Sequence, residues 1–371
     1  MPSELTPPGI TKDDQERIAQ SGIDLNMENR CGSYLQMNQD VIQSECREAG
    51  IEVLSFKKAM EKHAWLKDYL WKAMSPDKDE ITKYVAEQPD PKGYVVIAHK
   101  GTKNILPIQA CLYLGRETIQ HVHNIIIAEE GAELHMISGC ASGGHVGNGA
   151  KHYGVSEFYV KKDAKISFTM IHTWNENVEV FPRSSSIVEE NGVFLSNYVC
   201  MQPVKKIQMY PVATLKGDNS VARFSTIAIA SPTSYLDLGS RAILEGKGAS
   251  AELVTRAITR GGTIMSRGHI HGKTAGTKGH LECKGLILKD GTIWAIPEIE
   301  GSVVGTELSH EAAVGKLAQE EIEYLMSRGL SEDEATATII RGFLDVKIAG
   351  LPESLQKQID ATIDVAEKAG F

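Results

Sequence analysis

The chain has 371 residues, 42% of them hydrophobic, and its 39 basic and 48 acidic residues give a formal net charge of −9. This acidic balance argues against nucleic acid or an anionic membrane as the main partner. No run of about 18 apolar residues occurs and no signal-like segment opens the chain, so we expect a cytoplasmic protein. The six cysteines include no Cys-x-x-Cys pair and are interpreted as reduced thiols.

The first region, residues 1–92, is predicted to be a helical domain. Residues 51–74 carry apolar side chains at helical spacing, with Trp65, Tyr69 and Trp71 on one side. We interpret these aromatic residues as core.

The middle region, residues 93–305, is predicted to be a right-handed parallel β-helix. A polar turn with Gly, Asp or Asn recurs between short β-branched runs, and successive turns start 32, 28, 27, 29 and 44 residues apart. One such turn per repeat is typical of a β-solenoid, and a large antiparallel sandwich is the alternative. The extra length before the last turn predicts a loop over residues 267–279. The turns start at Glu129, Lys161, Glu189, Lys216, Glu245 and Lys289.

The last region, residues 306–371, is predicted to be a second helical domain. Ser309 is expected to cap a helix from His310 to about Arg328 that Gly329 stops. A capping box at 331–334 predicts another helix to near Gly350, and Pro352 starts a third. The region is either a docking module or a cap on the solenoid's end.

Soft and anionic side chains gather where the β-rich stretch meets this last region. Cys283 lies in the last predicted strand, and His310 and Glu311 follow Ser309. Thiolate, imidazole and carboxylate are the groups that hold iron or zinc. The alternative is that Cys283 is a small buried residue and that Ser309 and Glu311 only begin a helix.

Histidine motifs elsewhere give weaker predictions. His121 and His123 are spaced as in a cupin metal motif, but the expected glutamate is absent at that spacing. Residues 268–274 end like a phosphate-binding loop, but three residues rather than four separate the glycines, which excludes nucleotide binding by that motif. A zinc site of His269, His271 and His280 would need a loop to bring them together, and a solvated loop is favoured.

Several stretches resemble the SufB/SufD family of iron–sulfur cluster assembly scaffolds. Glu282-Cys283 matches a family strand, and Thr173-Trp174-Asn175 stands where SufB has a glutamine-asparagine-tryptophan strand. The C-terminal signature is long and specific. The matching residues are Lys100-Gly101, Leu106 to Ala110, Glu130-Gly131-Ala132, Leu134 to Cys140, Leu286-Ile287, Asp290, His310-Glu311-Ala312, Gly315-Lys316-Leu317, Tyr324-Leu325, Ser327 to Leu330, Glu334-Ala335 and Gly342-Phe343.

The resemblance implies a role for individual residues. Cys140 matches the cysteine that accepts sulfur, and Cys283, His310 and Glu311 match positions proposed to hold a transient iron–sulfur cluster. Trp174 and Arg183 become candidates for the sulfur path. Candidates for docking an ATPase are Tyr324, Arg328, Gly329 and Phe343.

The resemblance also implies partners. These are a SufC-type ABC ATPase, a sulfur donor protein, apo iron–sulfur proteins, and a second copy of the chain or a SufD-like paralogue. Ser309-His310 looks like SufD and Glu311 like SufB, which favours a homodimer that replaces the usual pair. Cys140 is followed by Ala141-Ser142-Gly143, not the usual Thr-Ala-Pro, and Tyr113 replaces an arginine of the proposed sulfur path.

We therefore expect a non-catalytic scaffold. The alternatives are a stand-alone metalloprotein that uses the His-x-His pairs and a β-helix carbohydrate-active enzyme. The sequence leaves open the cluster type, the sulfur source, a bound flavin and the roles of His269, His271 and His280.

Overall fold

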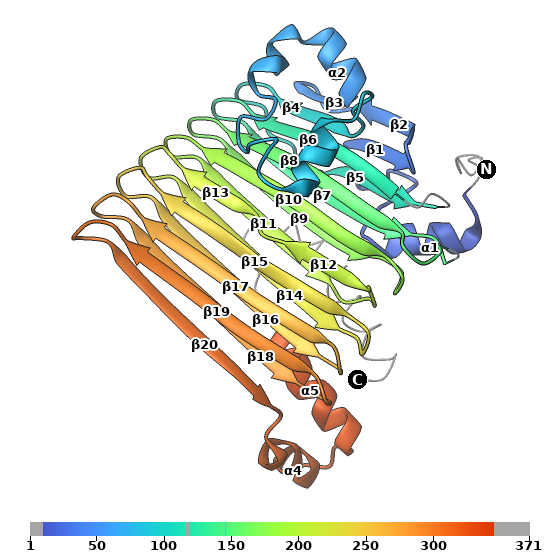
Figure 1. Cartoon of the computed structure of the whole chain (residues 1–371), viewed down its shortest axis with the longest axis vertical. Helices are drawn as coiled ribbons and strands as arrows, with labels where there is room; N and C mark the ends of the chain where they lie inside the picture. Colours follow the sequence, from blue (N-terminus) through green and yellow to red (C-terminus); the bar gives the residue numbers. More distant parts are fainter. Residues whose placement is uncertain (1–9, 116–118, 145, 345–371) are drawn as a thin grey trace.

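The chain forms a stack of coils in which most coils give one strand to each of two sheets (Figure 1). The computed structural model describes residues 10–115, 119–144 and 146–344. Sheet A runs in the order β2 (Asp40–Cys46), β1 (Gly32–Met37), β5 (Ile108–Leu114), β7 (Glu133–Ser142), β9 (Lys165–Thr173), β11 (Val193–Cys200), β14 (Val221–Ala230), β16 (Ser250–Thr259), β18 (Lys278–Ile287) and β20 (Glu307–Lys316).

Sheet B faces sheet A across the interior. Its order is β19 (Thr292–Gly301), β17 (Thr263–Gly272), β15 (Tyr235–Leu244), β12 (Lys206–Met209), β10 (Glu179–Val188), β8 (Lys151–Val160), β6 (Ile119–Ala128), β4 (Tyr94–Ala98) and β3 (Ile51–Ser55), with β13 (Val212–Leu215) also lying between β10 and β15.

Parallel pairing dominates both sheets and confirms the predicted β-solenoid. Within the described residues, only β1 with β2 and β3 with β4 pair antiparallel. The sandwich alternative is therefore wrong, since its sheets would be antiparallel throughout. The sense of the coil stays a prediction.

The recurring turns stack on one another, which explains the sequence repeat. Each holds one residue in the left-handed region, with φ of 67° at Gly131, 58° at Asp163, 53° at Asn191 and 55° at Asn219. Gly, Asn and Asp tolerate this region best. The amide of each of these residues donates to a carbonyl of the next turn. Asn191 N, for example, donates to Asp218 O at 2.8 Å.

The interior between the sheets is filled by inward-facing side chains from every coil. Rings touch within a coil, with centroids 4.8 Å apart for Phe158 and Phe168, and between successive coils, with centroids 5.1 Å apart for Phe158 and Phe194. This single apolar cluster runs from Cys31 near the first coils to Ile293 in β19. Alternation along each strand therefore decides which side chains are inside.

The helices are short and pack on the outer faces of the sheets. Helix α1 (Lys12–Gln20) and helix α5 (Glu332–Leu344) contribute to apolar clusters with outward residues of sheet A. Helix α2 (Phe56–Lys62), the 3-10 helix η1 (Ala64–Asp68) and helix α3 (Glu80–Ala86) lie against sheet B. Helix α4 (Gln319–Ser327) follows β20. No helix in the described part of the chain is long and apolar enough to cross a membrane.

Three predicted elements are wrong. Residues 51–74 begin with strand β3, and residues 267–279 hold the end of β17 and the start of β18 instead of a loop. The turn near Lys273 was missed, and the turn at Lys289 lies on the other edge of the stack, which accounts for the 44-residue spacing. The expected helix from His310 is strand β20, and the helical segment begins at Gln319.

The C-terminal helices agree better with the sequence. Gly329 follows α4 with φ of 99°, and Ser331 and Glu334 form the predicted capping box of α5. The helix predicted from Pro352 lies outside the described residues. The domain limits at 92/93 and 305/306 stay predictions, and strands β1, β2, β3 and β20 from the outer regions pair within the two sheets.

The turn stack predicts a steric penalty at Gly217. A Cβ there would lie 1.9 Å from the backbone nitrogen of Glu190 in the preceding coil. We expect Gly217→Ala to lower the free energy of unfolding by about 1–3 kcal/mol, because overpacking forces the coils apart. Urea denaturation measures this loss. Gly147→Ala is the control, since nothing lies within 4 Å of its Cβ position. Equal midpoints for the two variants would contradict the close approach of the coils.

Candidate functional site

The last coil of the stack brings strands β18 and β20 side by side. They pair in parallel, with Leu281 opposite His310, Glu282 opposite Glu311 and Cys283 opposite Ala312. Cys283 is buried and belongs to the interior cluster, whereas Glu282 lies on the outer face. The alternation of the strand therefore separates Cys283 from the carboxylates.

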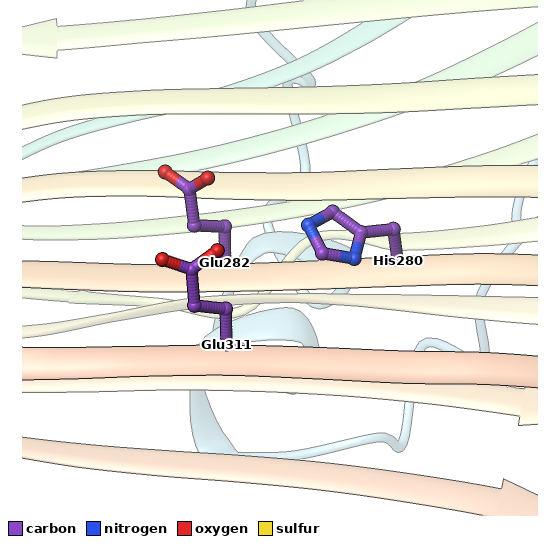
Figure 2. Close-up of side chains that lie close together, drawn as sticks. All are labelled: His280, Glu282 and Glu311. Atoms are coloured by element: carbon purple, nitrogen blue, oxygen red, sulfur yellow. The ribbon is translucent and has the colours of Figure 1, made fainter.

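Three metal-binding side chains gather on the outer face of this coil. His280, Glu282 and Glu311 have ligand atoms that all lie within 4.8 Å of one another, and Figure 2 shows the two carboxylates and the imidazole on one side of the strands. The Nδ1 atom of His280 is 3.0 Å from Ser309 Oγ, which leaves Nε2 available. An imidazole and two carboxylates suit a divalent transition metal.

Cations already neutralise these carboxylates. Glu282 contacts Arg256, and Lys284 Nζ lies 3.4 Å from Glu282 Oε1 and 3.1 Å from Glu311 Oε1. Burial opposes the ionisation of Glu282, but Arg256 and Lys284 hold the pKa of this carboxyl below its ordinary value. A metal ion at this group would have to displace Lys284, the more flexible of the two cations.

His310 lies on the other side of β20 from Glu311. Its partner in the register, Leu281, is fully buried, so strand alternation puts His310 on the inward side, as it does Cys283. His310 is nevertheless exposed, because the described chain has no coil beyond β20. The structure thus brings Cys283 and His310 to one side of the last coil and Glu311 to the other.

The thiol of Cys283 is held in its neutral form. Burial raises the pKa of Cys283. A metal ion would reverse the balance, since a coordinating thiol loses its proton to the metal.

Cys140 lies deep in the interior, in strand β7. It is 1% exposed, and burial raises the pKa of its thiol to about 12. Its register partner in β9 is His172, whose Nδ1 is 2.9 Å from the hydroxyl of Tyr198. A neutral thiol at this depth is a poor nucleophile.

Trp174 stands next to this group of polar side chains. Its ring centroid lies 5.5 Å from that of His172 and 5.0 Å from that of His152. Its indole Nε1 is buried without a hydrogen-bond partner. Trp174 lies inside the solenoid and directly follows β9, the neighbour of the strand that holds Cys140.

A cavity opens in the interior farther along the stack. It measures about 30 Å³ and is lined by inward side chains that include Met170, Ser184, Ser196 and Tyr198. A water needs roughly 10–15 Å³ on this scale, so one or two waters fit. The cavity lies between the coil of Cys140 and the coil of Cys283.

Arg183 lies outside this interior. Its Nε donates to Asp79, the N-cap residue of α3, and its Nη1 donates to Gln208 O at 2.8 Å. The neighbouring Ser184 and Ser186 line the cavity, so Arg183 points to the outer face of sheet B. The guanidinium therefore holds α3 against the sheet.

The candidate docking residues lie on and after α4. Tyr324 is 58% exposed, and the Arg328 guanidinium lies over its ring at 5.3 Å. Phe343 packs beside the apolar cluster that α5 forms with sheet A. Gly329 supplies only the left-handed turn between the helices. Tyr324 and Arg328 are thus the residues of this set that a partner could touch directly.

The His-x-His pairs make no compact metal site in the described chain. The Nε2 of His123 is 2.8 Å from the buried Glu157, and the stacked rings of His269 and His271 are 6.2 Å apart with Glu300 near both. Among the described residues, the group that could hold a metal is His280, Glu282 and Glu311.

Comparison with known proteins identifies the family. Residues 112–343 match the family described as "SUF system FeS cluster assembly, SufBD core domain". The chain belongs to the SufBD family. A SufBD family protein of Archaeoglobus fulgidus is 50% identical over 96% of this chain and 95% of its own length. A SufBD family protein of Methanothermobacter thermautotrophicus is 45% identical over 97% of this chain and 89% of its own length. One of Staphylococcus epidermidis is 33% identical over 70% of this chain and 57% of its own length.

The chain is therefore a protein of iron–sulfur cluster assembly with a β-solenoid core, as the resemblance predicted. Sequence reasoning left the role of His280 open and did not single out Glu282. The i, i+2 spacing of these residues places them on one face of a strand. Their closeness to Glu311 depends on the pairing of β18 with β20, which the predicted helix at His310 concealed.

Proposed function

We propose that this SufBD protein is the scaffold on which an iron–sulfur cluster is assembled and from which it is transferred to apo proteins. The observation that carries the proposal is a buried thiol, Cys283, one strand from the open end of the solenoid. Iron and sulfide are the substrates, and the chain supplies ligands without catalysing a reaction of its own.

Cys283 is the principal ligand in this proposal, with His310 beside it and Glu311 across the edge strand. Thiolate is the usual ligand of iron–sulfur clusters, and an imidazole can replace it on one iron. His310 is exposed on the side that Cys283 faces. Glu311 can bind iron only if its ion pair with Lys284 breaks. Its bond to iron is therefore weaker than that of Cys283.

A second copy of the chain is the partner proposed for this end. Strand β20 is an edge of sheet A and β19 an edge of sheet B, and Figure 1 shows both at one end of the stack. Apolar side chains are exposed here, with Trp294 60%, Val314 40% and Val304, in the turn between the strands, 98% exposed. Edge strands have unpaired backbone N–H and C=O groups that can pair with a strand of another chain. Two copies would bring both Cys283 sites to one interface, and a SufD-like paralogue is the other partner that fits.

Cys140 is proposed to accept sulfur, which then moves through the interior. Trp174 and the cavity lined by Tyr198 lie between Cys140 and Cys283 in the order of coils. Arg183 is left out of this path because its guanidinium lies on the outer face of sheet B.

A SufC-type ABC ATPase is proposed to dock on the C-terminal helices. Helix α4 begins three residues after β20 ends, so a force on α4 is transmitted to the strand that carries His310 and Glu311. ATP hydrolysis by that partner would open the end of the solenoid. These roles fit a cytoplasmic protein.

The ligand proposal is tested by anaerobic reconstitution with iron and sulfide. We expect Cys283→Ser to remove most of the bound iron, because thiolate bonds to iron are the most covalent in the set. Glu311→Gln should weaken iron retention about tenfold. Glu307→Gln is the control, as another exposed glutamate of β20 that pairs with a lysine. Iron analysis and absorbance provide the readout, and unchanged iron in Cys283→Ser would remove that residue from the site.

The sulfur proposal is tested with a matched pair of buried thiols. Burial raises the pKa of both Cys140 and Cys200 to about 12, and both belong to the interior cluster. Cys140→Ser should block cluster formation from a persulfide donor protein and leave formation from free sulfide intact. Cys200→Ser should affect neither. Loss under both conditions in Cys140→Ser alone would indicate a structural role for Cys140.

The docking proposal predicts a specific loss of ATPase binding. Tyr324→Ala should weaken binding of the purified ATPase about tenfold or more, the effect of losing an aromatic hot spot. Tyr235→Ala is the control, because Tyr235 is also exposed but lies in β15. Calorimetry measures both affinities. Equal affinity for the two variants would move the docking surface away from α4.

A further inference from the structure

Two thiols meet at the other end of the solenoid, far from Cys283 in the order of coils. Cys31 precedes β1 and Cys46 ends β2, and these strands pair with Gly32 opposite Cys46. The backbone nitrogen of Arg47 donates to Cys31 O at 2.7 Å, which holds the two segments together. A Cβ at Gly32 would lie 3.1 Å from Cys46 Sγ, so the glycine makes room for that sulfur.

The two cysteines are near neighbours across the strand pair. Cys31 Sγ lies 2.9 Å from the carbonyl oxygen of Leu106, and Cys31 directly precedes Gly32, the residue opposite Cys46. The Asn104 amide, 3.9 Å from Cys31 Sγ, fixes the inner thiol from the other side.

The environments of the two thiols differ. Cys31 is 5% exposed, whereas Cys46 is half-buried on the outermost strand of sheet A. The neighbouring thiol of Cys31 lowers the pKa of Cys46 to about 7, and the neighbouring Cys46 together with burial raises the pKa of Cys31. A reachable thiolate beside a protonated thiol is the arrangement that thiol–disulfide exchange requires.

We propose that Cys46 and Cys31 form a dithiol site that takes sulfane sulfur from a persulfide or polysulfide and releases it as sulfide. The proposal rests on the proposed function, because cluster assembly consumes sulfide. It adds a substrate class and an entry point for sulfur that is separate from Cys140.

The chemistry balances in two steps. The Cys46 thiolate attacks a sulfane sulfur of an inorganic polysulfide, an S–S bond breaks, and the shortened polysulfide leaves with the electron pair. The Cys31 sulfur then attacks the sulfur of Cys46, and hydrosulfide leaves with the proton of Cys31. The sulfane sulfur gains two electrons and the dithiol becomes a Cys31–Cys46 disulfide. A small-molecule dithiol reduces this disulfide and completes the cycle.

The position of the pair suits this role. Cys31 belongs to the same continuous interior cluster as Cys140 and Cys283. Cys46 packs against that cluster and is partly exposed. The pair thus connects the outer surface with the interior at the end of the solenoid that strands β1 and β2 close.

Mass spectrometry of the full chain after anaerobic treatment with sodium tetrasulfide tests the proposal. The reduced wild type should lose two hydrogens and give linked peptides of Cys31 and Cys46, with a transient gain of one sulfur beforehand. Cys31→Ser should retain one added sulfur on Cys46. Cys46→Ser should show neither change, and Cys200→Ser should behave like the wild type.

The proposal would be overturned if the wild type kept added sulfur on other cysteines and formed no Cys31–Cys46 disulfide. This holds for any result with the variants. A Cys31–Cys46 disulfide in the wild type would also overturn it if no added sulfur appeared on Cys46 in either the wild type or Cys31→Ser. Reconstitution from free sulfide separates this result from the proposed function, since Cys46→Ser should still assemble a cluster from iron and sulfide. Loss of that assembly would show that Cys46 supports the fold.

Discussion

The hydrogen bonds between successive coils are the interaction on which the rest of this structure depends. Each strand satisfies its backbone groups with the strands one coil before and after it, and the turns bond to one another in the same way. This arrangement is local, because each coil needs only its neighbours. It also leaves one requirement unmet, since the last coil has backbone groups along β19 and β20 with no partner in the described chain.

The same geometry sorts the reactive side chains into two environments. Alternation along β18 turns Cys283 inward and His280 and Glu282 outward. Burial keeps the inward thiols neutral, while cations balance the outward carboxylates. In the proposed scaffold function, iron therefore reaches Cys283 only when a partner engages or moves the open end of the solenoid.

The sequence predicted the solenoid well because its turns need residues that tolerate a left-handed backbone, such as Asn191 and Asn219. The prediction of a helix from His310, where the structure has strand β20, was wrong for a physical reason. All but one residue of this strand are exposed, so it lacks the alternation that marks a strand, and Ser309-His310-Glu311 reads like the start of a helix. The His280, Glu282 and Glu311 group and the Cys31–Cys46 pair depend on strand pairing, which the spacing of single residues does not reveal.

The central claim is that the cluster forms at the open end of the solenoid, next to Cys283. Anomalous diffraction at the iron edge, from crystals of the anaerobically reconstituted protein, tests it most directly. The account predicts iron peaks beside the Cys283 sulfur, at the end formed by β18, β19 and β20. Iron peaks at Cys31 and Cys46, or at any site away from the last coil, would contradict it.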